Sequence, residues 1–130
     1  MRISRFSILL AAIAYAAIGL IFLIDPVYWG SSVDISLPTP TAIIDLRATY
    51  GGCMLAIAIF LAYCLANSRL IRVGLIFQAI SLGGFGLARL AGIIMNPPTR
   101  GIMYYLLLAE IFGVALAVYC LSRLPKTDNI

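Results

Sequence analysis

Four ionisable side chains lie inside long apolar stretches of the sequence, where charged residues are rare. They are Asp45, Arg47, Arg89 and Glu110. A charge at the centre of a membrane-spanning helix costs roughly 2.5 to 3.5 kcal/mol, so such residues normally face the bundle interior and pair with one another. Two arginines and two carboxylates can form a neutral network. A planar guanidinium can also hold the carboxylate, phosphate or carbonyl group of a ligand.

The composition indicates the elements that position these residues. The chain has 130 residues, of which 63% are hydrophobic and 11% charged, with a mean hydropathy of +1.07. A soluble domain is about half apolar and a quarter charged. A membrane span takes roughly 20 apolar residues, so four spans fill the chain. We expect one all-α integral membrane domain over residues 1–130, a four-transmembrane-helix bundle with spans at about 6–24, 40–65, 69–95 and 100–121. Because four spans fill the chain, the composition excludes a nucleic-acid-binding module.

Basic residues predict the orientation of the bundle, because Lys and Arg are retained in cytoplasmic segments. With four spans, six basic residues fall on one side: Arg2, Arg5, Arg69, Arg72, Arg123 and Lys126. The opposite connections carry only Arg100 together with Asp25 and Asp34. We therefore expect both termini in the cytoplasm and a multi-pass protein of the bacterial cytoplasmic (inner) membrane.

Counting along the helices places the four charges at similar depths. At 1.5 Å per residue, Asp45 and Arg47 lie about 8 and 10 Å down the second span, Arg89 about 9 Å and Glu110 about 15 Å from the same side. Gln78 returns to within about 20° of the face of Arg89, and Tyr50 shares the face of Arg47. The predicted ligand-binding site or ion network, in the outer half of the bilayer, comprises Asp45, Arg47, Tyr50, Gln78, Arg89 and Glu110.

Small residues recur at four-residue spacing and predict close helix packing, because they let membrane helices approach one another. The seams are Ala48-Gly52-Ala56, Gly84-Ala88-Gly92 and Ala109-Gly113-Ala117. The glycines expected to pack helices are Gly51, Gly52, Gly84, Gly86, Gly92 and Gly113. We expect packing within the bundle, with contact to a partner subunit as the alternative.

Three segments carry a family resemblance. The run Asp45-Leu-Arg-Ala-Thr-Tyr-Gly-Gly52, the run Gly83-Gly-Phe-Gly-Leu-Ala-Arg89 and the run Leu108-Ala-Glu110 resemble the bacterial four-span family catalogued as domain of unknown function 4345. That family more often has glutamate at the position of Asp45. The resemblance covers nearly the whole chain and implies a four-span fold, with no activity to carry over.

Other residue types narrow the function. Histidine is absent, and the three cysteines have no metal-ligand or redox spacing, so we expect no metal, no cofactor and no catalytic residue, and an enzyme is the least favoured class. Three hypotheses remain. The charges form an ion network that fixes helix register, or they bind a lipid-like, isoprenoid or quinone-like molecule, or the chain is a structural or accessory subunit of a larger membrane complex. The expected partners are the lipid bilayer and either such a ligand or another membrane protein.

Overall fold

The described part of the chain, residues 1–97 and 99–125 of a computed structural model, is helical and contains no strand. Its elements in order are α1 (Arg2–Ile24), α2 (Pro26–Ser31), α3 (Pro40–Leu46), η1 (Arg47–Cys53), α4 (Met54–Ala66), η2 (Ser68–Leu70), α5 (Ile71–Met95) and α6 (Gly101–Arg123). Four helical stretches within these residues are long and apolar enough to cross a membrane: Arg2–Ile24, Pro40–Ala66, Ser68–Met95 and Gly101–Arg123. They match the predicted spans. The largest difference is at the start of the first, which begins at Arg2 rather than at Phe6.

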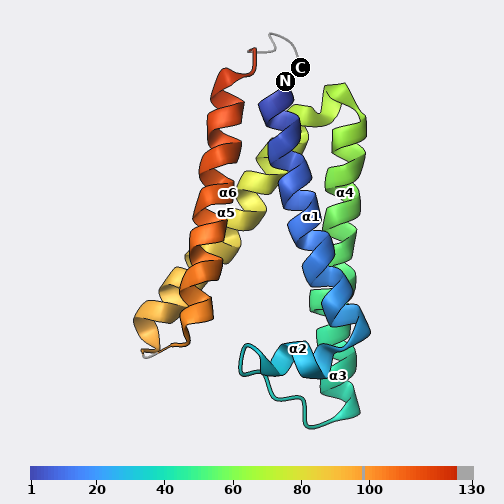
Figure 1. Ribbon diagram of the computed structural model, residues 1–130, viewed down its shortest axis with the longest axis vertical. Coiled ribbons are helices and arrows are strands. Elements are labelled where there is room, and N and C mark those ends of the chain that lie inside the picture. Colours follow the sequence, from blue (N-terminus) through green and yellow to red (C-terminus); the bar gives the residue numbers. More distant parts are fainter. Residues whose placement is uncertain (98, 126–130) are drawn as a thin grey trace.

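Helix α1 is the central element of the bundle. It contacts α4, η1, α5 and α6, while α5 and α6 pack closely along each other. Figure 1 shows the start of α1 and the end of α6 at one end of the bundle, called here the terminal end, and α2 lying across the opposite end. Toward that opposite end the pair α1–α4 diverges from the pair α5–α6. The best-buried core side chains lie nearer the terminal end and include Ile8, Leu61, Ile71 and Leu75. The described basic residues predicted to share one side, from Arg2 to Arg123, belong to this terminal end, and Lys126 lies outside the described residues.

Capping residues fix where the helices begin. Thr39 accepts a hydrogen bond from the backbone N–H of Ala42 (3.2 Å) and precedes Pro40 at the first helical position, an arrangement that satisfies an otherwise unpaired N–H group. Asp25 caps α2 in the same way. At the third span Asn67 provides the cap, since its Oδ1 accepts from the N–H of Arg69 (3.1 Å).

The second span is interrupted by the π-helical segment η1. The second span contacts α1 there through two glycines, Gly19 on α1 and Gly51 on η1. A Cβ on Gly19 would lie 2.8 Å from the backbone N of Leu55 and 3.0 Å from the carbonyl oxygen of Gly51. A Cβ on Gly51 would lie 2.8 Å from Cγ of Leu23. Glycine at both positions therefore permits backbone-to-backbone contact between α1 and the second span.

Candidate functional site

The predicted charges of the third and fourth spans form one buried ion pair. Arg89 on α5 donates from Nε to both carboxylate oxygens of Glu110 on α6 (3.1 and 3.0 Å) and from Nη2 to Oε1 (2.7 Å). The side chains are 21% and 10% exposed. Gly86 faces Glu110, where an added Cβ would meet the Cβ of Glu110 at 3.5 Å and Oε2 at 3.8 Å. The pair thus joins α5 to α6 in a charge-assisted, side-on geometry.

The ion pair does not use all the hydrogen-bond donors of Arg89. Its Nη1 donates only to the thioether sulfur of Met103 (3.3 Å), and sulfur is a weak acceptor. A guanidinium has five N–H donors, of which Nε, one on Nη1 and one on Nη2 have partners. The two others find no acceptor within residues 1–97 and 99–125.

Arg89 also lines a groove between the ends of α5 and α6 that lie away from the termini. The groove holds about 250 Å³. Its six lining residues are Arg89, Gly92, Ile93, Asn96, Thr99 and Met103. Most of this wall is apolar, with polar groups at Arg89 and near the helix ends. The arrangement offers cationic N–H donors beside a small apolar recess.

The second-span members of the predicted site do not join this pair. Asp45, Arg47 and Tyr50 are exposed, and neither charged side chain forms an ion pair with any residue in the described part of the chain. The expected convergence of three helices is therefore not found. Tyr50 instead stacks its ring against Phe22 of α1, with centroids 5.1 Å apart.

The physical reason is that the second span extends past the end of α1. Gly51 lies opposite Leu23 of α1, and α1 ends at Ile24. Because the two helices run antiparallel, the residues preceding Gly51 continue beyond that end. Leu46 accordingly meets Gly30 of α2, where an added Cβ would be 3.3 Å from Cδ2 of Leu46. A depth counted from Pro40 therefore places Asp45 and Arg47 too far inside the bundle. The segments that carry these residues, α3 and η1, pack on α1 and α2 rather than on the α5–α6 pair.

Gln78 belongs to a separate, uncharged cluster nearer the terminal end. Its Nε2 donates to Oγ of Ser7 on α1 (3.0 Å) and to the carbonyl oxygen of Gly113 on α6 (3.0 Å). One turn along, the hydroxyl of Tyr15 donates to Ser81 (2.9 Å), and Ser81 donates to the carbonyl oxygen of Gln78 (3.3 Å). Ser7 is not among the site residues predicted from the sequence. Its position could have been predicted from the spacing of polar residues in the first span. Ser4, Ser7 and Tyr15 recur at helical spacing, and all three face the interior of the bundle.

The six predicted packing glycines divide into two groups. Gly51, Gly86 and Gly113 contact neighbouring helices, and an added Cβ on Gly113 would overlap Cδ1 of Leu82. An added Cβ on Gly52, Gly84 or Gly92 would meet no neighbouring atom within 4 Å. For these three, packing within the described part of the chain is not found: Gly52 and Gly84 are exposed, and Gly92 lines the groove beside Arg89.

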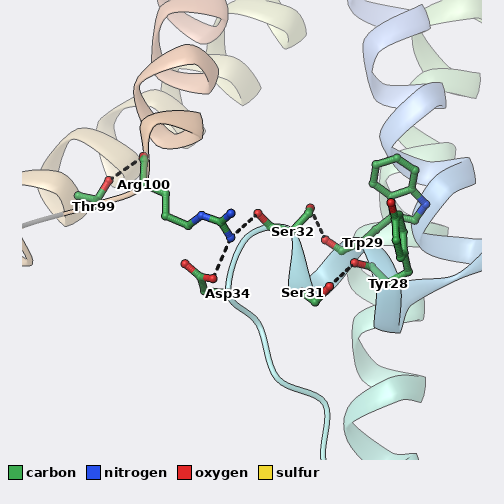
Figure 2. A network of polar contacts seen from close by, with 7 residues as sticks. All are labelled: Tyr28, Trp29, Ser31, Ser32, Asp34, Thr99 and Arg100. Carbon is green, nitrogen blue, oxygen red and sulfur yellow. Dashed lines mark hydrogen bonds and ion pairs between the residues drawn. The ribbon is translucent and has the colours of Figure 1, made fainter.

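A second ion pair ties α6 to the segment after α2. Nη1 of Arg100 donates to Oδ1 of Asp34 (2.9 Å) and to the carbonyl oxygen of Ser32 (3.1 Å), as Figure 2 shows. Asp34 has a positive φ of 62°, and the N–H groups of Asp34 and Ile35 bond the carbonyls of Ser31 and Gly30. This is the left-handed helix-ending motif that usually contains glycine. Sequence reasoning did not predict the tether, which closes the end where the helix pairs diverge.

Comparison with known proteins identifies the class of the chain. The family described as Domain of unknown function (DUF4345) matches residues 3–121. The chain therefore belongs to this family, as the three segments around Asp45, Arg89 and Glu110 indicate. No curated protein and no solved structure matches the chain.

Proposed function

We propose that this protein binds the polar head of a lipid-like or quinone-like molecule in the groove beside Arg89. The observation that carries the proposal is the hydrogen-bonding state of that guanidinium. It is mostly buried and fixed by Glu110, yet one donor meets only a thioether and two meet no acceptor in the described residues. An arginine held in this way is preorganised for a carbonyl, carboxylate or phosphate oxygen.

The dimensions of the groove favour a head group over a whole lipid. Pockets that enclose a drug-sized ligand measure roughly 300–1,000 Å³, and this groove of about 250 Å³ is smaller. A ring or head group fits, and its apolar tail would then lie along the exposed faces of α5 and α6. Those faces carry large apolar side chains such as Leu87, Ile94 and Leu108, which are 72%, 69% and 63% exposed.

The setting that we propose is a bacterial cytoplasmic (inner) membrane, crossed four times, with both termini in the cytoplasm. Four helices long and apolar enough to cross a membrane support the membrane setting. The basic residues gathered at the terminal end agree with cytoplasmic termini, because Lys and Arg are retained on that side. The groove beside Arg89 would then open toward the outer leaflet.

Native mass spectrometry of gently extracted protein tests the binding site. The informative variant is Arg89→Gln/Glu110→Gln, which removes the guanidinium without leaving a lone buried charge. We expect the wild type to retain a copurifying small-molecule adduct, and the double variant to lose it. Decylubiquinone and oleate, added to delipidated protein, would show whether the site prefers a carbonyl or a carboxylate head.

Arg47→Gln is the matched control, because it removes the same kind of charge from an exposed position outside the groove. Equal loss of the adduct in this control would show that the ligand is held elsewhere. A wild type without any adduct and without binding of either probe would reject the binding function and leave the pair as a register-fixing ion network.

The second candidate function is a structural or accessory subunit of a larger membrane complex. It is favoured by the uncovered seams, since Gly52 and Gly84 have open space beside them and small residues are typical of helix–helix contacts in membranes. Gly52→Leu distinguishes the two functions. In a complex this substitution would block the contact and release the chain as a monomer, as measured by native mass spectrometry. In a chain without a partner, the mass and the bound adduct would stay unchanged.

A further inference from the structure

We propose a second binding site, for the phosphate head group of an anionic phospholipid, at the terminal end between α1 and α6. A groove of about 250 Å³ lies between the start of α1 and the end of α6, at the end of the bundle away from the Arg89 groove. Its wall includes Arg2, Ser4, Tyr119 and Arg123. The site does not depend on the proposed function.

The charges at this end favour an anion. Five described arginines gather here from three parts of the chain: Arg2, Arg5, Arg69, Arg72 and Arg123. Arg5 donates to Ser68, and Arg72 donates to the carbonyl oxygen of Pro125. Neither Arg2 nor Arg123 has an ion-pair partner in the described part of the chain. Four to eight basic residues beside a membrane are typical of anionic lipid binding.

A hydroxyl in the groove wall adds a specific contact. Ser4 is only 4% exposed, lines the groove and has no hydrogen-bond partner among residues 1–97 and 99–125. The first N–H groups of the 23-residue helix α1 are also without intrahelical acceptors, and no side chain caps them. A phosphate here would receive hydroxyl, backbone N–H and guanidinium donors together.

The walls indicate that the phosphate belongs to a lipid. The groove also contains Ile3 and Leu124, and Ile3 is 56% exposed. Arg123 lies over the ring of Tyr119, 5.4 Å from its centroid, which keeps the guanidinium at the level where the apolar helix ends. Acyl chains would pass along the apolar surface while the head group stays among the arginines.

Native mass spectrometry with added phosphatidylglycerol tests this site. We expect delipidated wild type to retain one phosphatidylglycerol molecule in preference to phosphatidylcholine. Arg2→Gln and Arg123→Gln should each lower the affinity for phosphatidylglycerol at least about tenfold, the effect of losing one charge-assisted hydrogen bond. Ser4→Ala should lower it about fivefold, as expected for a neutral hydrogen bond.

Arg69→Gln is the matched control, because it removes the same charge at the same end without touching the groove. If it weakens lipid binding as much as Arg123→Gln does, general surface charge explains the binding and the site is refuted. Equal retention of the two lipids, or displacement of phosphatidylglycerol by inorganic phosphate, would also overturn the proposal. Arg89→Gln/Glu110→Gln should leave phosphatidylglycerol binding unchanged, which separates this test from that of the other groove.

Discussion

The bundle contains two buried polar clusters that use different chemistry, a neutral one that joins α1, α5 and α6 and a charged one that joins α5 and α6 alone. Around Gln78 the groups are neutral, and each side-chain nitrogen and oxygen has a partner in the described part of the chain. Around Arg89 the groups are charged, and the guanidinium has N–H groups beside a groove that find no acceptor in the described part of the chain. A satisfied neutral cluster only fixes how helices pack. A charged cluster with spare donors beside a groove can also bind a ligand.

The largest expected effect comes from separating the buried charges. Glu110→Gln leaves Arg89 without its counter-ion and should lower the free energy of unfolding by roughly 3 kcal/mol, the loss typical of a broken buried pair. The double variant Arg89→Gln/Glu110→Gln should recover most of that loss, because neither charge remains. Thermal unfolding can be followed with a thiol-reactive dye, since Cys64 and Cys120 are buried. Equal unfolding temperatures for the single and double variants would show that charge pairing contributes little.

A smaller effect is expected in the neutral cluster. Gln78→Leu leaves the buried hydroxyl of Ser7 without its partner and should cost about 2 kcal/mol. Adding Ser7→Ala should restore most of the stability, because replacing both partners by apolar groups is nearly neutral. The same unfolding measurement applies. Loss of a copurifying adduct in the Ser7→Ala/Gln78→Leu variant, despite normal stability, would break the distinction between the two clusters.

The smallest effect is expected at the exposed ion pair. Asp34 and Arg100 have side chains that are 67% and 55% exposed, and such pairs contribute at most about 1 kcal/mol. Asp34→Asn removes the charge while keeping a residue that tolerates the left-handed conformation. Its unfolding temperature should therefore change little, and added salt should reduce the difference further. A loss of stability as large as that of Glu110→Gln would mean that burial does not determine how much each arginine–carboxylate pair contributes to the free energy of unfolding.

The apolar pattern was sufficient to predict the four spans, because long apolar runs bounded by proline and capping residues leave few alternatives. The Arg89–Glu110 pair was also predictable from depth. These residues lie on consecutive antiparallel helices joined by a short connection. The end of α5 and the start of α6 therefore lie at the same level, and depths counted from these two helix ends can be compared.

The position of Asp45 and Arg47 could not be predicted in this way. Depth counting assumes that all helices end at one level, whereas the second span continues past α1 beside α2. That offset depends on the tertiary contact at Gly19 and Gly51, which no local pattern encodes. The π-helical turns of η1 and the left-handed conformation of Asp34 were likewise not predicted from the sequence.

The tether at Arg100 has a spectroscopic consequence. The chain contains a single tryptophan, Trp29 on α2, and its ring meets that of Tyr28 edge to face with centroids 5.2 Å apart. The carbonyl oxygen of Trp29 accepts from the hydroxyl of Ser32 (2.6 Å), and the carbonyl of Ser32 accepts from Arg100. The unmodified protein thus carries its single tryptophan beside the tether (Figure 2). Its emission wavelength, and its quenching by brominated lipids, would report the position of α2 without any label.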